Sequence, residues 1–276
     1  MTSQAEAAQA ASGSSFYAGM RILPPAEREA MYAIYAYCRA VDDIADDQGG
    51  TRESREDALQ QWRRAIDALY RGGDAGLAAF LLPAVERFGL RREDFEAVID
   101  GMAMDVARDI RWPPMAELDL YCDRVASAVG RLSVRVFGMD DEPGRQLSHH
   151  LGRALQLTNI LRDIDEDAAI GRVYLPAEAL TAAGVPLDDV GRVIADPRID
   201  AAGRILADRA QDHFGQASAI MAARPRGHLI APRLMEAAYS RLLRKMVATG
   251  WRPPRRRVGH NKLALMWTLL RLKLAG

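Results

Sequence analysis

The chain has no excess of charge of either sign, because its 37 Lys and Arg residues balance its 37 Asp and Glu residues. A balanced surface gives no reason to expect nucleic acid as a partner. Cysteine is scarce as well: Cys38 and Cys122 are the two in the chain, and both fall in helical patterns rather than in a Cys-x-x-Cys spacing. Two isolated thiols indicate reduced core residues, so we expect a cytoplasmic protein.

No apolar run reaches the roughly 20 residues that a membrane-spanning helix needs. Residues 1–13 have neither an apolar run nor a basic start, which argues against a secretory signal and predicts a flexible segment. At the other end, residues 258–276 are apolar with scattered basic positions and predict a short helix. Beside Arg255, Arg256 and Arg257, this helix would either lie peripherally on the inner face of a membrane or pack back on the domain.

Strand patterns are missing too, and residues 14–257 predict one all-helical domain. A chain of 276 residues with 49% hydrophobic composition is long enough to bury a substantial core. Gly and Pro interrupt the helical patterns at 71–76, 89 and 112–114. The strongest helical patterns cover residues 26–47, 142–168, 199–223 and 230–247.

Two of these helices carry acidic residues at helical spacing. Asn159, Asp163 and Asp167 recur every four residues, so they project from one face, about 6 Å apart along the helix axis. A second helix repeats the arrangement, with a polar face made of Tyr35, Arg39, Asp42 and Asp46. One such pair is usually just a solvated face. Two acidic faces, each beside an apolar packing stripe, instead predict a central cavity.

Neighbouring aspartates repel one another and destabilise their helices unless water or a cation screens them. Mg²⁺ relieves this repulsion well, and the two aspartate pairs have no other obvious counter-charge. It prefers carboxylate oxygens and is commonly bound by one or two carboxylates plus substrate phosphates, which Arg39 and Arg162 would also suit. A third pair, Asp105 and Asp109, is expected to be mainly structural. The expected metal ligands are Asp42, Asp46, Asn159, Asp163 and Asp167.

Longer motifs surround these acids: SSFYAGMRILPP at 14–25, the acidic box at 42–46, NILRDIDED at 159–167, GRVYLP at 171–176 and WRPPRRRV at 251–258. Together they resemble the squalene and phytoene synthase family of head-to-head prenyl transferases, over nearly the whole chain. Within this family these motifs look most like those of the bacterial presqualene diphosphate synthases of hopanoid pathways. The resemblance implies a helical bundle of the isoprenoid synthase type.

The resemblance also implies roles for single residues. Ser15 and Phe16 would lie over the diphosphate, and the connection 169–185 would be a flap over the site. The implied catalytic residues are Tyr35, Arg39, Tyr121, Arg162, Tyr174 and Tyr239. The implied substrate-binding residues are Ser15, Phe16, Gln156, Asn159 and Arg172.

The reaction implied is the condensation of two farnesyl diphosphates to presqualene diphosphate, with two or three Mg²⁺ ions per site and release of pyrophosphate. We expect that the reaction does not use NADPH. The chain has no G-x-G-x-x-G motif, but this is weak evidence, because reductive members of the family bind nicotinamide without it. Squalene-forming enzymes would then act downstream. Phytoene, dehydrosqualene and squalene synthases share the same boxes and remain alternatives. A further alternative is a helical protein without catalysis that binds a metal or a partner through its acidic helices.

Overall fold

The computed structural model describes residues 19–47 and 49–259, and helices make up most of this part of the chain. The all-α prediction is therefore confirmed, and the described ranges contain only one isolated parallel bridge, between Arg111 and Val173. The elements are α3 (Pro25–Asp46), α4 (Arg52–Arg71), the 3-10 helix η1 (Gly76–Leu81), α5 (Leu82–Phe88), α6 (Arg92–Ala107), α7 (Met115–Cys122), the π-helix η2 (Asp123–Ser127), α8 (Ala128–Val136), α9 (Asp141–Arg162), α10 (Ile164–Ala169), α11 (Ala177–Ala182), α12 (Val190–Ala195), α13 (Ile199–Ala222) and α14 (Ile230–Thr249).

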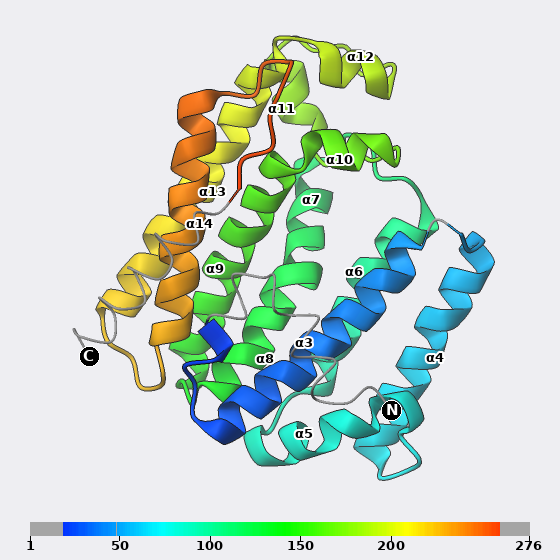
Figure 1. Ribbon diagram of the computed structural model, residues 1–276, viewed down its shortest axis with the longest axis vertical. Coiled ribbons are helices and arrows are strands. Elements are labelled where there is room, and N and C mark those ends of the chain that lie inside the picture. Colours follow the sequence, from blue (N-terminus) through cyan, green and yellow to red (C-terminus); the bar gives the residue numbers. More distant parts are fainter. Residues whose placement is uncertain (1–18, 48, 260–276) are drawn as a thin grey trace.

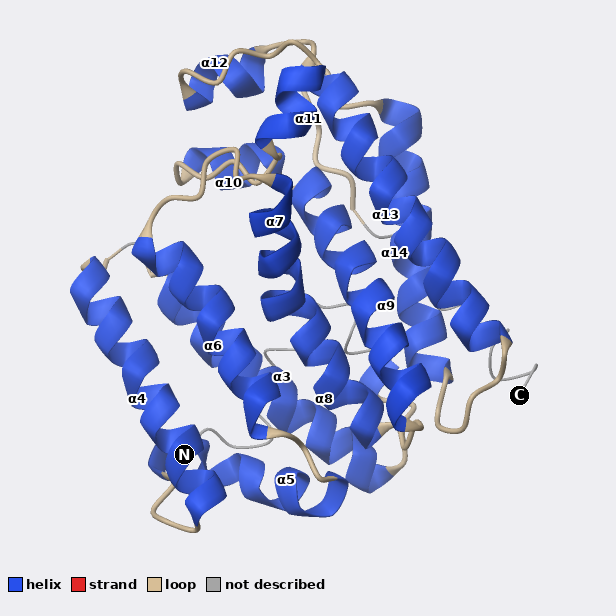
Figure 2. Ribbon diagram, turned by 180° about the vertical axis from the view of Figure 1, so that it is seen from behind, coloured by secondary structure: helices blue, strands red, loops and turns tan. Residues whose placement is uncertain are grey.

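The long helices stand side by side in one bundle (Figure 1). Helix α9 packs against α8, α13 and α14, and helix α6 packs against α3, α4 and α8, so α8 joins the two halves. Figures 1 and 2 place α4 and α14 on opposite flanks, with α10, α11 and α12 across one end. This arrangement leaves α3 and α9 facing a common interior, and these are the helices that carry the acidic residues.

The first acidic helix is held by a buried tyrosine. Tyr37 is fully buried, its hydroxyl donates to the Phe95 carbonyl oxygen at 2.7 Å, and its ring meets Trp62 and Phe95 edge to face. These contacts fix α3 against α4 and α6 through one side chain. Because residues four apart share a helix face, burial of Tyr37 and Val41 on one side directs Asp42 and Asp46 to another.

The second acidic helix is not continuous, so the prediction of one helix over 142–168 is wrong at Asp163. Helix α9 ends at Arg162 and α10 begins at Ile164, with Asp163 at φ −104° and ψ 19°. The Leu161 carbonyl, which a continuing helix would pair with the N–H of residue 165, instead accepts from the Trp251 indole nitrogen at 2.9 Å. A contact from residue 251 thus helps to end the helix, and no local pattern signals it.

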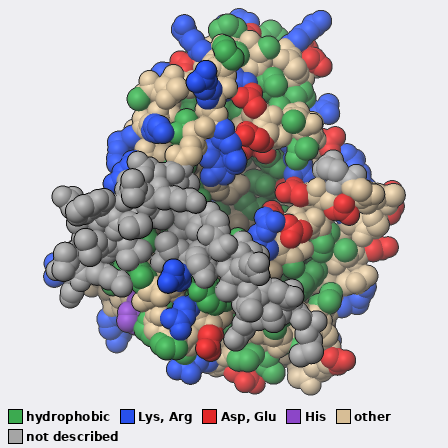
Figure 3. Space-filling model, in the orientation of Figure 1, with side chains coloured by type: hydrophobic (Ala, Val, Ile, Leu, Met, Phe, Trp, Pro, Cys, Tyr) green, Lys and Arg blue, Asp and Glu red, His purple; other side chains and the backbone are tan. Residues whose placement is uncertain are grey.

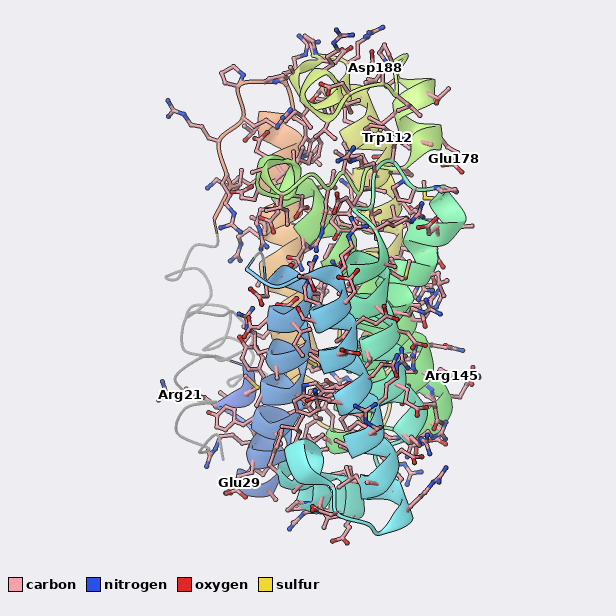
Figure 4. All side chains as sticks on the ribbon, turned by 90° about the vertical axis from the view of Figure 1, so that its right-hand side faces the viewer. Arg21, Glu29, Trp112, Arg145, Glu178 and Asp188 are labelled. Carbon is pink, nitrogen blue, oxygen red and sulfur yellow. The ribbon has the colours of Figure 1, made fainter. Side chains whose placement is uncertain are left out.

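The connection 169–185 is attached to the loop between α6 and α7. Val173 donates to the Ile110 carbonyl at 2.8 Å and accepts from Trp112 N–H at 2.7 Å. Glu178 accepts from the Met115 N–H at 2.9 Å, and Figure 4 shows Trp112 and Glu178 at the same end of the molecule. The connection also contains α11, and the short helix α12 follows it; neither helix was predicted.

The expected segment 1–13 and nearly all of the expected helix over 258–276 lie outside the described residues. The domain boundaries at 14 and 257 therefore stay predictions. Within the described ranges no helix is long and apolar enough to cross a bilayer.

Candidate active site

The acidic face of α3 is already paired with arginines. Arg39 donates from Nη1 to the Asp42 Oδ2 atom at 2.9 Å and also contacts Asp43. From the connection after α10, Arg172 donates to Asp46 Oδ1 and to the Ala45 carbonyl, both at 3.0 Å. The Arg172 side chain is buried, and it brings the connection directly onto the first acidic box.

The second box has two arginine partners. Arg162 donates from Nε to Asp163 Oδ1 at 2.8 Å, and Arg257 donates to the same oxygen from Nη2 at 2.7 Å. The expectation that the aspartate pairs have no other counter-charge is therefore wrong for Asp163, and Asp42 and Asp46 have arginine partners as well. The sequence missed Arg257 because 94 residues separate it from Asp163.

The pKa of Asp163 is shifted in the opposite direction from those of Asp42 and Asp167. For Asp163, burial alone would raise the pKa, but hydrogen bonds from Arg162 and Arg257 outweigh it and lower the pKa. Burial and then the charge of Asp163 raise the pKa of Asp167 to about 7. Burial and then the charge of Asp46 raise the pKa of Asp42 to about 6, although 38% of its side chain is exposed. Negative charge is thus incompletely compensated in both boxes.

The two boxes face each other across Asp105. This carboxylate is buried on α6, and its charge acts on both Asp42 and Asp167. It accepts from the Tyr174 hydroxyl at 2.6 Å and from the Tyr121 hydroxyl at 3.0 Å, and the two rings stack 5.0 Å apart. Asp105 was expected to be mainly structural. Its place between the two boxes was not predicted, because the sequence does not show which residues contact it. Asp109, its supposed partner, instead contacts Arg52 at the surface.

A mostly apolar cavity lies between α3, α8, α9 and α14. Its wall becomes polar at Gln156 and Asn159, on the side of the second box. Burial raises the pKa of Tyr239, which lies against Arg162 and Asn159, and that of Tyr35, which lies beside Arg39. Apolar lining comes from Met31, Val129, Phe137, Leu151, Leu155 and Met235 among others.

Figure 3 shows a hollow in this face of the molecule, with acidic side chains on both of its sides and basic ones beside them. Of the candidate residues from the sequence, the structure groups Asp42, Asp46, Asp163 and Asp167 with the arginines and tyrosines named above. Ser15 and Phe16 lie outside the described residues, so their roles stay predictions.

The residues present fit a divalent cation. The Oδ1 atom of Asn159 is buried without a hydrogen-bond partner in the described part of the chain, which is costly for an amide oxygen. It stands one helical turn before Asp163, and the raised pKa values of Asp42 and Asp167 mark oxygens that would gain from added positive charge. An oxygen set of carboxylates and one amide suits Mg²⁺.

One of the two expected placements put the segment with the C-terminal arginines on a membrane, but Arg255 and Arg257 contact the second box. Arg255 donates to Asp165 at 3.1 Å and to the Ile194 carbonyl at 2.9 Å, and Arg257 contacts Asp163 and Glu166. These charges are thus engaged within the domain, which lowers their availability to an anionic lipid surface.

The first expected result is that Asp167→Asn stabilises the metal-free protein at pH 8. The pKa of Asp167 is about 7 in the folded protein, whereas an aspartate without such contacts, as in the unfolded chain, has a pKa of 3.8. Between these two pH values the folded state therefore holds more protons than the unfolded state. Its stability therefore falls as pH rises through this window. Asn removes that loss, and the variant should melt a few degrees above the parent at pH 8 but not at pH 4. Melting curves in chelator measure this, with the exposed Asp165→Asn as control.

An equal pH dependence in the Asp167→Asn variant and the parent would contradict this assignment. Saturating Mg²⁺ should abolish or reverse the difference, because the ion removes the same repulsion in the parent. We do not expect the same gain from Asp163→Asn, since Asp163 is stabilised by its two arginines.

Known proteins resemble this chain over almost its full length. The family model for squalene/phytoene synthase matches residues 9–263. The chain is 65% identical over 264 residues to the presqualene diphosphate synthase of Zymomonas mobilis, covering 96% of this chain and 90% of the relative. It is 53% identical to the presqualene diphosphate synthase of Sinorhizobium fredii, covering 95% of this chain and 94% of the relative.

More distant relatives share the family. The 15-cis-phytoene synthase of Synechocystis is 35% identical over 74% of this chain and 64% of its own length. The crystal structure of a squalene synthase from Alicyclobacillus acidocaldarius has a TM-score of 0.77 at 26% identity, covering 91% of this chain and 94% of that one. The matching motifs, the facing acidic boxes and these similarities lead to one conclusion: the chain belongs to the squalene/phytoene synthase family.

Proposed function

We propose that this protein joins two molecules of farnesyl diphosphate head to head and releases presqualene diphosphate and pyrophosphate. The observation that carries the proposal is an apolar cavity that meets the second acidic box at Gln156 and Asn159, with the first box facing the second across Asp105. An apolar wall suits prenyl chains, and the boxes suit diphosphates bound through cations. The two presqualene diphosphate synthases above support this product over others of the family.

Asp42, Asp46, Asn159, Asp163 and Asp167 would hold Mg²⁺. The bound ions would supply Lewis acidity at the diphosphate oxygens and neutralise their charge. Arg39, Arg162 and Arg172 now bond to carboxylates of the boxes, and each can exchange that partner for a diphosphate oxygen. Together these charges stabilise pyrophosphate as the bond from C1 of the first substrate to oxygen breaks.

The allylic cation formed in this way is attacked by the double bond of the second substrate, and loss of one proton closes the cyclopropane. Tyr121 and Tyr174 hydroxyls both donate to Asp105, so their oxygen lone pairs remain available to a nearby cation. Burial raises the pKa of both tyrosines far above neutrality, so they act as neutral dipoles. The connection held by Arg172 and Val173 limits water at this end of the site.

The second expected result concerns the product. Purified protein with Mg²⁺ and farnesyl diphosphate should release mostly presqualene diphosphate, and NADPH should change neither the rate nor the product. Mass spectrometry of the lipids, with and without NADPH, measures this. Squalene or dehydrosqualene as the main product would overturn the assigned step within the family.

Geranylgeranyl diphosphate gives the matched comparison of chain length. A C40 hydrocarbon from it would reassign the chain to the activity named for the phytoene synthase relatives. If no prenyl diphosphate releases pyrophosphate, the protein is not an enzyme of this class. The result would then favour the alternative of a helical protein that binds a metal or a partner. Peripheral membrane contact and coupling to squalene-forming enzymes are further parts of the proposal that lipid co-sedimentation and coupled assays can test.

A further inference from the structure

Three histidines meet on a part of α9 and α13 that the proposed reaction does not use. His149 and His150 come from α9, and His213 comes from α13, which packs along α9. The cavity is lined from α9 by Ser148, Leu151 and other residues of that face. His150 lies about half a turn round the helix from Ser148, so the group is directed away from the cavity.

The ring nitrogens of the three residues converge. One ligand nitrogen from each lies within 4.8 Å of the other two. The Nδ1 atoms of His150 and His213 are 3.0 Å apart. Two nitrogens bound to one Zn²⁺ at about 2.0–2.1 Å with tetrahedral angles stand roughly 3.3 Å apart, so this pair is already close to a metal-binding separation.

A simple hydrogen bond between two neutral rings explains part of this geometry. It accounts for the contact between His150 and His213, but it does not involve His149. The ring centroid of His149 lies 4.8 Å from that of His150 and 5.9 Å from that of His213. His149 is the most exposed of the three, so rotation about its side-chain bonds can close the remaining gap.

The charges around the group do not prevent binding of a cation. Arg153, whose charge acts on all three histidines, is buried and donates to both oxygens of Asp119 at 3.0 and 2.9 Å, and to Asp123 at 3.1 Å. Arg209 also contacts Asp119, at 3.4 Å. Both guanidinium groups are thus compensated by carboxylates. Arg153 further donates to the His149 carbonyl oxygen at 3.4 Å, which helps to fix the turn that presents the two adjacent histidines.

We propose that His149, His150 and His213 bind one transition-metal ion of the Zn²⁺ class and thereby join α9 to α13. Imidazole nitrogens suit Zn²⁺, Ni²⁺ and Cu²⁺, whereas Mg²⁺ prefers oxygen ligands. Three histidines leave a fourth position for water or another ligand. The site is therefore separate in both place and chemistry from the acidic boxes.

The test uses the full chain without an affinity tag, treated with chelator and then dialysed into excess Mg²⁺ to occupy the acidic boxes. Titration calorimetry with Zn²⁺ alone should show one equivalent bound, and Zn²⁺ should raise the melting temperature. His213→Ala should weaken binding at least about tenfold. His228→Ala is the matched control, because His228 lies elsewhere, beside Glu27, and should bind Zn²⁺ like the parent.

Co²⁺ gives a second readout, since its visible absorption reports tetrahedral nitrogen ligation and should be lost in His213→Ala. His149→Ala, at the exposed position, provides a variant for which folding is not in question. The absence of stoichiometric Zn²⁺ binding in the parent, or unchanged binding in both variants, would overturn the proposal. Mg²⁺-dependent pyrophosphate release should stay within about twofold of the parent in His149→Ala, so this test fails or succeeds independently of the proposed reaction.

Discussion

Replacing Asp163 by Asn is expected to lower turnover about a thousandfold or more while the fold persists. Asp163 stands at the break between α9 and α10, where Arg162 and Arg257 converge on its carboxylate. Asn has nearly the same shape, but it provides a neutral oxygen in place of the charge that would hold Mg²⁺. The transition state for ionisation concentrates negative charge on the departing pyrophosphate, so weaker metal binding raises the barrier directly.

Asp165→Asn is the matched control for this change. Asp165 lies two residues away, is about half exposed and pairs with Arg255 rather than with the facing box. It should retain turnover within a few fold of the parent, whereas Asp42→Asn should behave like Asp163→Asn. Pyrophosphate release measures activity, and melting curves show whether each variant is folded. Full activity of the parent in excess chelator, or near-normal turnover of Asp163→Asn, would contradict the metal site.

The sequence predicted the parts of the site that depend on helical period. Asp42 with Asp46, and Asn159 with Asp163, recur at four residues, and this spacing fixes their common face without knowledge of tertiary contacts. The local helices around them were predicted within a few residues as well, since Pro24 at the N-cap and Pro25 at the first position of α3 are local signals.

The parts that the sequence did not predict depend on contacts between distant residues. Arg172 meets Asp46 across 126 positions, and Trp251 meets the end of α9 across 90 positions. Neither contact follows from a period or a cap, because the fold alone brings these residues together. The same reason explains why the sequence did not show the surroundings of Asp105: it was expected to be mainly structural from its spacing to Asp109, while its hydrogen-bond partners are on α7 and after α10.

The second large effect is expected from the replacement of Asp105. Asp105→Asn should lower turnover by about one to two orders of magnitude and lower the melting temperature by several degrees. The carboxylate accepts two buried hydroxyls with separate oxygens, from Tyr174 at Oδ1 and from Tyr121 at Oδ2. An amide offers one oxygen, so one hydroxyl must meet an NH₂ group. A mismatched buried polar group costs about 1–3 kcal/mol, which corresponds to roughly 2–12 °C in a protein of this size.

The loss of charge matters beyond the two tyrosines. Burial raises the pKa of Asp105 and the charge of Arg172 lowers it, so the carboxylate and this guanidinium act on each other between the boxes. Without the carboxylate, Arg172 keeps Asp46 and the Ala45 carbonyl as partners but loses the interaction with the buried charge of Asp105. Asp109→Asn, at the exposed neighbour that pairs with Arg52, is the control and should leave both turnover and melting temperature nearly unchanged.

Tyr174→Phe separates the two contributions of Asp105. It removes one donor and keeps the charge, so it should lower turnover through the lost dipole while it disturbs Arg172 less than Asp105→Asn does. The initial rate of pyrophosphate release and the melting temperature of both variants should therefore change in different proportions. If Asp105→Asn matches the parent in both measurements, the carboxylate does not order the tyrosines, and stabilisation of the cation must come from other residues of the cavity, with Tyr239 beside Arg162 and Asn159 as the first to replace.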